Sequence, residues 1–596
     1  MSEQVGFLTQ LGREIKDMGK EVGQAWRRMR IGLHNASRQY QHIDYIVMPL
    51  SGTFPERSGP PRSFLQRQLP LPPEPLSMQM LNGRFQQIAD ATNVKGVVLI
   101  LKNITAGFAT LQNLRRSVER LRSAGKEVIV FADSLDNGRY LIATAADRII
   151  VPPSAEFGVY GLRIEALFLK EALAKIGVDF DNIQISPYKT ASNMFDKADI
   201  TPEQREQLNW LLDETFDLLT AAIADGPGLS QNEVKELIDR APIFPEEAKL
   251  EKLIDDIAYE DELAYLLAPP IDEDEEPAAN NGTRPQANLV NWAEGQQLLT
   301  RKYRQLTSKY IGVVSLEGLI MMGQSTTPPI DLPIPFIGGS TAGETTLTQI
   351  LREAEQDEQM AALIFHVDSG GGSALASDLI GRQVERLSRK KPVLVYMGNT
   401  AASGGYYVSA MAQHIMSQSG TLTGSIGVVL GRPNTKELYE KVGINRVGLM
   451  RGKRANLFTD EAPLTEEERQ VFWEGIVHVY NQFKEIVAKG RNIPFDELDE
   501  ICEGRVWTGR QAAEHQLVDS HGDFVDAIYK TAALANLTIN DHWAVPVVNL
   551  FGSAEDYQLP QPYEAAEELL NLFTAARLKH LQEPLALMPF EVKLLH

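Results

Sequence analysis

Ser403 is the residue best placed for chemistry, because it lies between Ala402 and the glycine pair that begins at Gly404. The apolar run at 393–397 just upstream predicts a buried strand, and the glycines predict a tight turn into a helix. Glycine lets a ligand approach the backbone closely, and the first amides of a helix have no partner within it. A serine there could attack a carbonyl carbon while neighbouring amides receive the oxyanion. A turn that only connects a strand to a helix would have the same composition. Evidence from the rest of the chain is therefore needed to assign a catalytic role to Ser403.

A serine hydroxyl becomes a nucleophile when a nearby base takes its proton. Histidine can do this, and so can a lysine whose pKa is lowered by burial. His366 and His414 are expected inside a strand and a helix respectively, and neither has an evident carboxylate partner. Two lysines each follow a strand-like segment and precede a helix: Lys189, among apolar neighbours, and Lys453, between two arginines. Lys189 is better suited to burial, and Lys453 is kept as the alternative base.

The two halves of the chain repeat one another. Adding 266 to a residue number carries Tyr140 to Tyr406, and after a gap a shift of 264 carries Thr201 to Thr465. Further matches are Gly52 with Gly318, 98–99 with 364–365, 128–130 with 394–396, Ile149 with Ile415, Gly161 with Gly427, 170–171 with 436–437, and Gly177 with Gly443. So many matches in one register indicate an internal tandem duplication, with one α/β domain in each half.

The two copies differ where chemistry would take place. Ser403 corresponds to Asn137, and the glycines at 370–372 correspond to 104–106, which contain none. The second half therefore keeps the features of a nucleophile turn and of a second glycine-rich strand end, and the first half has lost both. The two candidate lysines also correspond to each other, with the shift of 264.

Apolar strands alternate with helices through both halves, which predicts crossover units and a largely parallel sheet in each. In the first half, helices are expected at 78–91, 109–124, 164–176, 202–225 and 231–240. The predicted domains are an amphipathic N-terminal segment at 1–44, a first repeat at 45–267, an acidic, Pro-rich linker at 268–295, a second repeat at 296–535 and a C-terminal extension at 536–596. In the extension we expect a strand at 544–550 and an amphipathic helix at 565–578, with no function assigned.

Composition limits the class of protein. At 596 residues the chain is too long for one core, and its net charge of −21 argues against nucleic acid as the main partner. The single cysteine, Cys502, rules out an intramolecular disulfide and is expected to be a core thiol. No metal-ligand constellation or phosphate loop is recognised, so no metal and no cofactor are expected.

Residues 5–33 carry an apolar residue at every third or fourth position, which predicts one amphipathic helix. Basic side chains on it outnumber acidic ones, so contact with a membrane surface is one interpretation. Packing on the same protein or on a sister chain is the preferred one. No segment reaches the roughly 18 apolar residues that span a bilayer, and no secretory signal is recognised. A cytoplasmic or membrane-peripheral location is therefore expected.

Four motifs together resemble those of the signal peptide peptidase A (protease IV) family. They are Ala-Ala-Ser-Gly-Gly-Tyr-Tyr at 401–407, Thr-Gly-Ser-Ile-Gly-Val at 423–428, Asp-Ser-Gly-Gly-Gly at 368–372 and Tyr-Lys-Thr-Ala at 188–191. The tandem layout is similar to the long form of that family, and the resemblance covers about residues 45–535.

The resemblance implies a Clp/crotonase-like fold in each half and a serine protease with a Ser–Lys dyad. In the long form the second half supplies the serine and the first half the lysine, which here correspond to Ser403 as nucleophile and Lys189 as general base. The oxyanion amides correspond to Gly404 and Gly371, and the Ser425 hydroxyl is expected to hold the lysine amine in place. The family further implies peptide substrates, among them signal peptides and other membrane-released or unfolded peptides, and a homo-oligomeric bowl of four chains.

Two features depart from the family pattern. Gly370 stands where the family usually has proline, which removes a fixed φ and is expected to loosen the oxyanion loop. The N-terminal membrane anchor common in the family is not recognised. Two other functions stay open at this point. One is a crotonase-type acyl-CoA hydratase or isomerase, which needs a pair of carboxylates and no serine at this turn; the other is a non-catalytic scaffold with a decayed protease fold.

Overall fold

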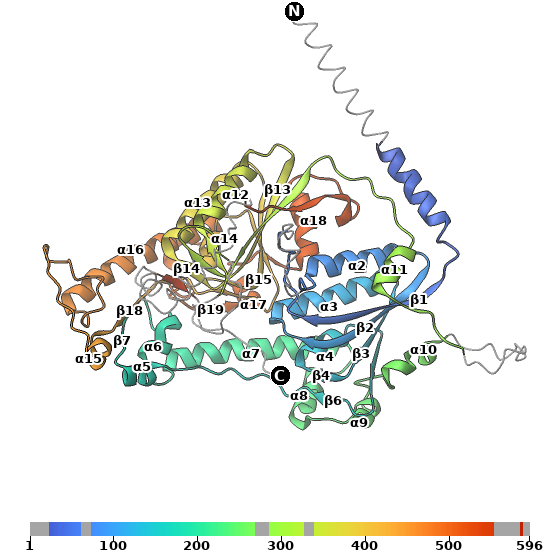
Figure 1. Ribbon diagram of the computed structural model, residues 1–596, viewed down its shortest axis with the longest axis horizontal. Coiled ribbons are helices and arrows are strands. Elements are labelled where there is room, and N and C mark those ends of the chain that lie inside the picture. Colours follow the sequence, from blue (N-terminus) through green and yellow to red (C-terminus); the bar gives the residue numbers. More distant parts are fainter. Residues whose placement is uncertain (1–22, 61–72, 269–284, 327–338, 553–584, 588–596) are drawn as a thin grey trace, which may run out of the picture.

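The computed structural model describes residues 23–60, 73–268, 285–326, 339–552 and 585–587. Two α/β bodies lie side by side, one built mainly from the first half of the chain and one mainly from the second (Figure 1). Each contains a central, largely parallel sheet with helices packed against it. The long helix α7 (Pro202–Asp225) runs between the two bodies.

The first sheet has the strand order β8-β5-β3-β2-β1-β9, and all its neighbouring strands are parallel. Its strands are β1 (Ile43–Gly52), β2 (Val94–Ile104), β3 (Glu127–Ala132), β5 (Arg148–Val151), β8 (Asp256–Ile257) and β9 (Leu289–Asn291). The centre of β2 reads Val-Val-Leu-Ile-Leu and is buried on both faces, because helices cover both sides of a parallel sheet. Beside it, β4 (Ser134–Asp136) and β6 (Glu156–Gly158) form a two-stranded sheet.

The second sheet repeats this arrangement as β20-β16-β15-β13-β10-β21, and β15 also pairs with β17, which carries β19. Its strands are β10 (Tyr310–Glu317), β13 (Met360–Ser369), β15 (Val393–Ala402), β16 (His414–Ser417), β17 (Leu422–Gly424), β19 (Val506–Thr508), β20 (Ser520–His521) and β21 (Val547–Asn549). The register repeats as well. Tyr45 pairs with Leu289 at the edge of the first sheet, and Ile311 pairs with Val547 at the edge of the second. The predicted α/β class with a tandem duplication is confirmed.

Each sheet is completed by a strand that lies beyond the predicted repeat. β9 falls in the segment predicted as a linker, and β21 falls in the predicted C-terminal extension. Both pair in parallel with the first strand of their sheet. The end of the linker from residue 285 therefore contributes to the first sheet, and the start of the extension contributes to the second. The helix predicted at 565–578 lies outside the described residues.

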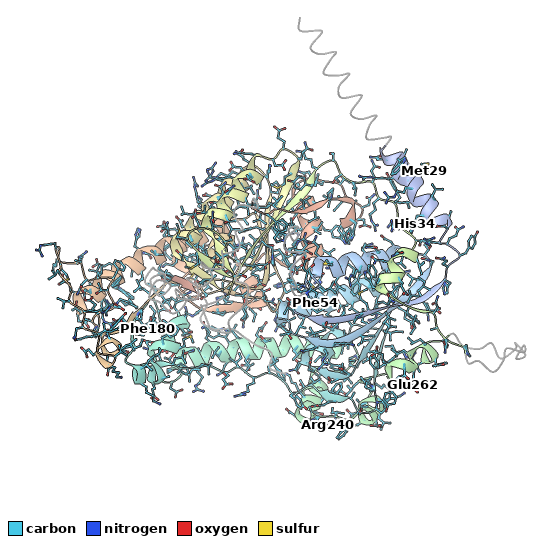
Figure 2. All side chains as sticks on the ribbon, in the orientation of Figure 1. Met29, His34, Phe54, Phe180, Arg240 and Glu262 are labelled. Carbon is cyan, nitrogen blue, oxygen red and sulfur yellow. The ribbon has the colours of Figure 1, made fainter. Side chains whose placement is uncertain are left out.

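A third sheet joins distant parts of the chain in the order β12-β11-β14-β22-β18-β7. Its strands are β7 (Asp179–Gln184), β11 (Leu319–Met321), β12 (Thr341–Gly343), β14 (Gly371–Ser373), β18 (Val429–Asn434) and β22 (Leu585–Leu587). β7 comes from the first half and pairs antiparallel with β18 of the second. Figure 2 accordingly shows Phe180 of β7 well apart from Phe54, Arg240 and Glu262 of the same half. The first half thus extends an arm, residues 170–200, onto the second repeat.

Helices cover the sheets, and several begin where the sequence places an N-terminal cap. Besides α7 they are α2 (Met78–Asp90), α3 (Phe108–Ser123), α4 (Asn137–Ala143), α5 (Lys170–Ile176), α6 (Asn193–Asp196), α8 (Gln231–Arg240), α9 (Pro245–Leu250), α10 (Leu263–Leu266), α11 (Trp292–Leu298), α12 (Glu344–Gln356), α13 (Ala374–Ser388), α14 (Gly404–Ser409), α15 (Lys436–Lys441), α16 (Glu466–Arg491), α17 (Gly509–Glu514) and α18 (Phe524–Leu534). Thr201 and Thr465 cap α7 and α16 with their side chains.

Two predictions of helix are corrected. The helix expected at 164–176 begins at Lys170, because residues 161–169 run without regular structure into the arm. His414, expected on the helix after Ser403, opens the strand β16, since α14 already ends at Ser409. As a strand beside β15, this segment buries the apolar side chains of Ile415 and Met416.

Residues 23–36 form a helix that belongs to the predicted amphipathic segment, whose residues 5–22 lie outside the described part of the chain. Its end is attached to the segment between the repeats, where His34 Nε2 lies 2.9 Å from the Leu299 carbonyl oxygen. Trp26 and Met29 of its apolar face stay more than half exposed, and Figure 2 shows Met29 and His34 at the margin of the molecule. Across the described ranges, no helix combines the length and the apolar character needed to cross a membrane.

Candidate active site

The turn that carries Ser403 joins β15 to the short helix α14, as predicted. Ser403 adopts φ 55° and ψ −114°, a conformation that residues other than glycine rarely take. Its amide donates to the Gly424 carbonyl at 2.8 Å, which ties the turn to β17. The following residue has to be glycine, because a Cβ on Gly404 would lie 3.1 Å from Gly371 Cα and 2.6 Å from Ser377 Oγ.

The arm of the first half brings Lys189 to this turn. The Ile185 amide donates to the Val428 carbonyl at 3.1 Å, so the pairing of β7 with β18 continues toward the serine. Beyond the lysine, α7 is fixed to the second repeat by Trp210, whose ring stacks on Trp507 with centroids 5.3 Å apart. Both sides of Lys189 are therefore held by the repeat that carries the serine.

Lys189 and Ser403 are 214 residues apart in the sequence and in direct contact in the structure. Lys189 Nζ lies 2.6 Å from Ser403 Oγ, 2.9 Å from the Ser425 carbonyl oxygen and 2.9 Å from Ser425 Oγ. All three residues are fully buried. Burial removes the hydration of the charged form and lowers the pKa of the Lys189 amine well below its ordinary value. The structure thus brings three of the predicted site residues into one hydrogen-bonded cluster.

Gly504 shapes the lysine site and was not predicted from the sequence. Its φ is +82°, and a Cβ there would lie 2.6 Å from Lys189 Cβ and 2.7 Å from Lys189 Cα. Its amide donates to the Ile426 carbonyl at 2.8 Å, next to Ser425, whose oxygens accept hydrogen bonds from Lys189. The duplication contains a signal for this residue. A shift of 264 carries Arg240 to Gly504, so the glycine is missing from the half that lacks the serine.

The glycine-rich end of β13 lies against the Ser403 turn. Gly371 and Gly372 have φ of +106° and +155°, which favours glycine at both. The Gly371 amide donates to Ser369 Oγ at 3.1 Å, and the Ser369 hydroxyl donates to the Gly318 carbonyl at 2.6 Å. These two bonds hold the loop that Gly370 was expected to loosen.

β22 lies between β14 and β18 and is antiparallel to both. Gly371 pairs with Leu587 and Gly372 with Ala586 on one side, and Val429 pairs with Leu585 on the other. Strands in a sheet are about 4.8 Å apart, so without β22 the edges of β14 and β18 would face each other across about 10 Å. Figure 1 shows β14, β18 and β7 gathered in this region. The space beside Gly371 therefore fits one extended strand.

Other residues considered from the sequence have partners away from the serine. The Lys453 side chain is 77% exposed and pairs with Glu467 at 2.5 Å. His366, inside β13 as predicted, contacts Glu317 at 3.4 Å. Cys502 is fully buried, as expected, and burial raises the pKa of its thiol.

Comparison with known proteins identifies one family and several relatives. Residues 120–269 and 385–538 match peptidase family S49, so a match falls in each half. The chain is 31% identical over 469 residues to the serine protease SPPA, chloroplastic, of Arabidopsis thaliana, covering 78% of this chain and 67% of that protein. It is 31% identical over 459 residues to protease 4 of Haemophilus influenzae, covering 76% of this chain and 72% of the relative. A solved structure of a mutant 1510-N membrane-bound stomatin-specific protease with a substrate peptide aligns at 18% identity and a TM-score of 0.26, over 42% of this chain and 96% of the other.

Proposed function

The chain belongs to peptidase family S49 and is a serine protease, and we propose that it hydrolyses peptide bonds with a dyad of Ser403 and Lys189. The observation that carries this proposal is the 2.6 Å separation of Lys189 Nζ and Ser403 Oγ at a buried site. The hydratase that the sequence left open is set aside because the family is a family of peptidases, and the contact between Lys189 and Ser403 argues against a non-catalytic scaffold.

Burial of Lys189 favours a neutral amine, which has two N–H groups and one lone pair. The two N–H groups match the carbonyl and hydroxyl oxygens of Ser425, each at 2.9 Å, and the lone pair is left for Ser403 Oγ–H. Lys189 takes that proton as the serine oxygen attacks the peptide carbonyl carbon, and then gives it to the leaving amine. The acyl-enzyme that remains is hydrolysed by a water molecule from which the same lysine takes a proton.

We assign the oxyanion to the amides of Gly404 and Gly371. Gly404 directly follows the nucleophile, and Gly371 packs against it. The Gly371 amide already donates to Ser369 Oγ, so its bond to the oxyanion would be shared with that hydroxyl. Such donors act where negative charge develops, and losing one typically lowers kcat about 100- to 1,000-fold.

Extended peptides fit the space between β14 and β18 that β22 fills. A strand edge binds any extended backbone through its amides and carbonyls, and side chains add selectivity only through neighbouring pockets. A folded protein rarely offers a free extended segment, which favours unfolded peptides, including released signal peptides, as substrates. Because β22 occupies the space beside Gly371, a substrate has to displace it.

Replacing Ala586 by proline is expected to raise kcat/KM about five- to tenfold, mainly through a lower KM. β22 competes with the substrate for this space and has a strand on each side. Proline removes one backbone hydrogen bond and so weakens the binding of β22 by about 1 kcal/mol. Initial rates with a fluorogenic peptide measure the change. Ala586→Ser keeps the amide and should behave as wild type; an Ala586→Pro enzyme with unchanged KM would contradict the prediction.

Activity is expected to rise with pH through the lowered pKa of Lys189 and then to level off. The base is the neutral amine, and an ordinary lysine with a pKa near 10.4 is neutral in about one molecule in 2,500 at pH 7. Burial lowers the pKa of Lys189, so the neutral fraction is larger and increases with pH up to that pKa. The dependence of kcat/KM on pH between 5 and 10 at constant ionic strength measures it. A steady decline above neutral pH would rule out a lysine base.

An active-serine phosphonate probe tests the nucleophile without a chosen substrate. Mass spectrometry should find the label on Ser403 in the wild type, slower labelling in Lys189→Met and none in Ser403→Ala. A label on another serine, or an unlabelled wild type, would overturn the proposed dyad.

We also propose a homo-oligomer as the working form, with four chains as in the family that the sequence resembles. Two segments of the chain expose apolar side chains, and each could contact another chain or a membrane. Trp26 is 58% exposed on the N-terminal helix, which suits a peripheral membrane contact or packing on a sister chain. A second exposed apolar segment follows α15.

A further inference from the structure

Residues 443–450, which follow α15 within the second repeat, expose apolar side chains. Val447 is 85% and Leu449 is 92% exposed. The segment has no regular secondary structure and no strand partner within the described ranges of the chain. Two neighbouring large apolar side chains left in water are typical of an interface that forms with another chain.

The duplication identifies what this segment corresponds to. Gly177 and Gly443 follow the ends of α5 and α15, both with left-handed φ (+83° and +75°), so the shift of 266 holds at this point. The same shift carries β7 to residues 445–450, and carries residues 163–168 to β18. β7 and β18 are paired in the structure, whereas their counterparts at 445–450 and 163–168 are both unpaired within the described part of the chain.

The side chains of the two unpaired segments fit the register of the paired ones. In the observed ladder Leu430 lies opposite Ile183, and the corresponding pair would be Ile164 and Leu449. Both members of the observed pair are buried. The observed apolar pair of Leu430 and Ile183 therefore corresponds to a second apolar pair, Ile164 and Leu449.

The next inward-facing position is changed on both segments at once. Arg432 and Asp181 form a buried ion pair at 2.8 Å, and the corresponding residues are Ala166 and Val447. Losing one member of a buried ion pair is strongly destabilising, whereas replacing both with apolar groups is tolerated. The paired change indicates that Ala166 and Val447 also meet.

We propose that residues 445–450 of one chain add as an antiparallel strand to residues 163–168 of a second copy. This interface deepens the proposed homo-oligomer and rests on it. The two surfaces differ, so each chain adds its residues 445–450 to one neighbour and accepts the same strand from another neighbour at its residues 163–168. Such a head-to-tail contact generates a ring when the rotation closes. Backbone pairing sets the antiparallel orientation of the two segments, and burial of Val447 and Leu449 stabilises the contact between the chains.

The two glycines that follow α5 and α15 support the same contact. Gly177 packs on α15, where a Cβ would lie 2.5 Å from the Leu438 nitrogen, and the Leu438 amide donates to the Gly177 carbonyl at 2.8 Å. Around Gly443 nothing lies within 4 Å of the same position. The shift of 266 carries Ala172 to Leu438, so the surface that would receive Gly443 is the first turn of α5 in the second copy.

A buried orphan acceptor marks the far end of this interface. Asn137 occupies the position of the serine in the first half, and its Oδ1 is buried with no hydrogen-bond partner within the described residues. Lys453 corresponds to Lys189, so the contact between copies would bring Lys453 toward Asn137. An ammonium group there would satisfy the amide oxygen. Asparagine offers no nucleophile, so this second site holds chains together and performs no hydrolysis.

The mass of the full-length protein in solution tests the interface, with light scattering after size exclusion as the readout. The wild type should be an oligomer, and the double variant Val447→Asp, Leu449→Asp should be a folded monomer. The matched control places the same charges on two exposed apolar residues of the first repeat, Phe244→Asp and Leu250→Asp, and should keep the wild-type mass. If the double variant does not fold, Leu449→Asp alone is expected to lower the mass.

Mixing two blocked variants distinguishes this interface from others. The variant blocked at 447 and 449 keeps an intact edge at residues 163–168. A variant with Ile164→Asp and Ala166→Asp keeps an intact segment at residues 445–450. Each alone should be a monomer, and a mixture should form a dimer and nothing larger. A monomeric wild type, an unchanged mass in both variants, or no dimer in the mixture would overturn the proposal. Because the readout is mass, a failure here is distinguishable from a failure of the Ser403–Lys189 dyad.

Discussion

Replacing Lys189 by methionine is expected to lower kcat/KM for peptide hydrolysis about ten-thousandfold, and Ser403→Ala is expected to lower it at least as much. Removing one member of a group that acts as a unit costs nearly the whole catalytic effect, with the remainder coming from substrate binding and the oxyanion donors. Methionine fills the volume of the buried lysine and cannot accept a proton. The double variant should therefore be no worse than either single one, which tests that the two residues act together.

Lys453→Met is the matched control, because Lys453 is the counterpart of Lys189 in the other half and its side chain is 77% exposed. It should keep most of the activity. If Lys453→Met lost activity while Lys189→Met kept it, the base would come from the second half or from a neighbouring chain. Activity in a Ser403→Ala enzyme would remove Ser403 as nucleophile.

Gly504→Val is expected to lower kcat/KM more than a hundredfold although Gly504 is not one of the proposed catalytic residues. At φ +82° a valine is strained, and its Cβ would lie 2.6 Å from Lys189 Cβ, within the backbone of the arm. Lys189 has to move, and a shift of about 1 Å in a reacting group lowers rates about a hundredfold. Gly504 is a positioning residue, so the pH at which activity reaches half its maximum should also shift, which a loss of folded protein alone would not produce.

Gly125→Val is the control for the backbone strain. Gly125 has φ +80°, nearly the same conformation, and nothing lies within 4 Å of its missing Cβ. Its replacement should cost stability by a similar amount, seen in thermal unfolding, and leave kcat/KM and its pH profile unchanged. Equal losses of activity in the two variants would contradict a role for Gly504 in positioning the lysine.

Elements with strong local signals could be predicted to the residue. α7 begins after the cap at Thr201 with proline in its first turn, and both ends match the prediction. The strand that leads to Ser403 was evident from its apolar run, because a parallel strand is buried on both faces. The tandem α/β fold followed from matches between the halves, and the duplication was visible without any structure.

Contacts between distant segments could not be predicted from local pattern. Nothing in the sequence around Lys189 says that it meets Ser403, and the choice between it and Lys453 depended on a family resemblance. The reason is physical: β7 leaves its own half and pairs with β18, and strand pairing between distant segments leaves no periodic signal. The same holds for β22, whose place beside Gly371 depends on two edges that the chain brings together only after folding.

The divided origin of the proposed dyad has a consequence for synthesis. Chains are made from the N-terminus, and domains generally fold as they emerge. The lysine arm is complete long before Ser403 leaves the ribosome, and Gly504, which packs against the lysine, emerges about 100 residues after the serine. A nascent chain therefore holds an unpartnered base and, later, an unactivated serine, and gains hydrolytic power only when nearly all of it has been translated. Proteolysis is withheld from the growing polypeptide by the order in which its parts are made.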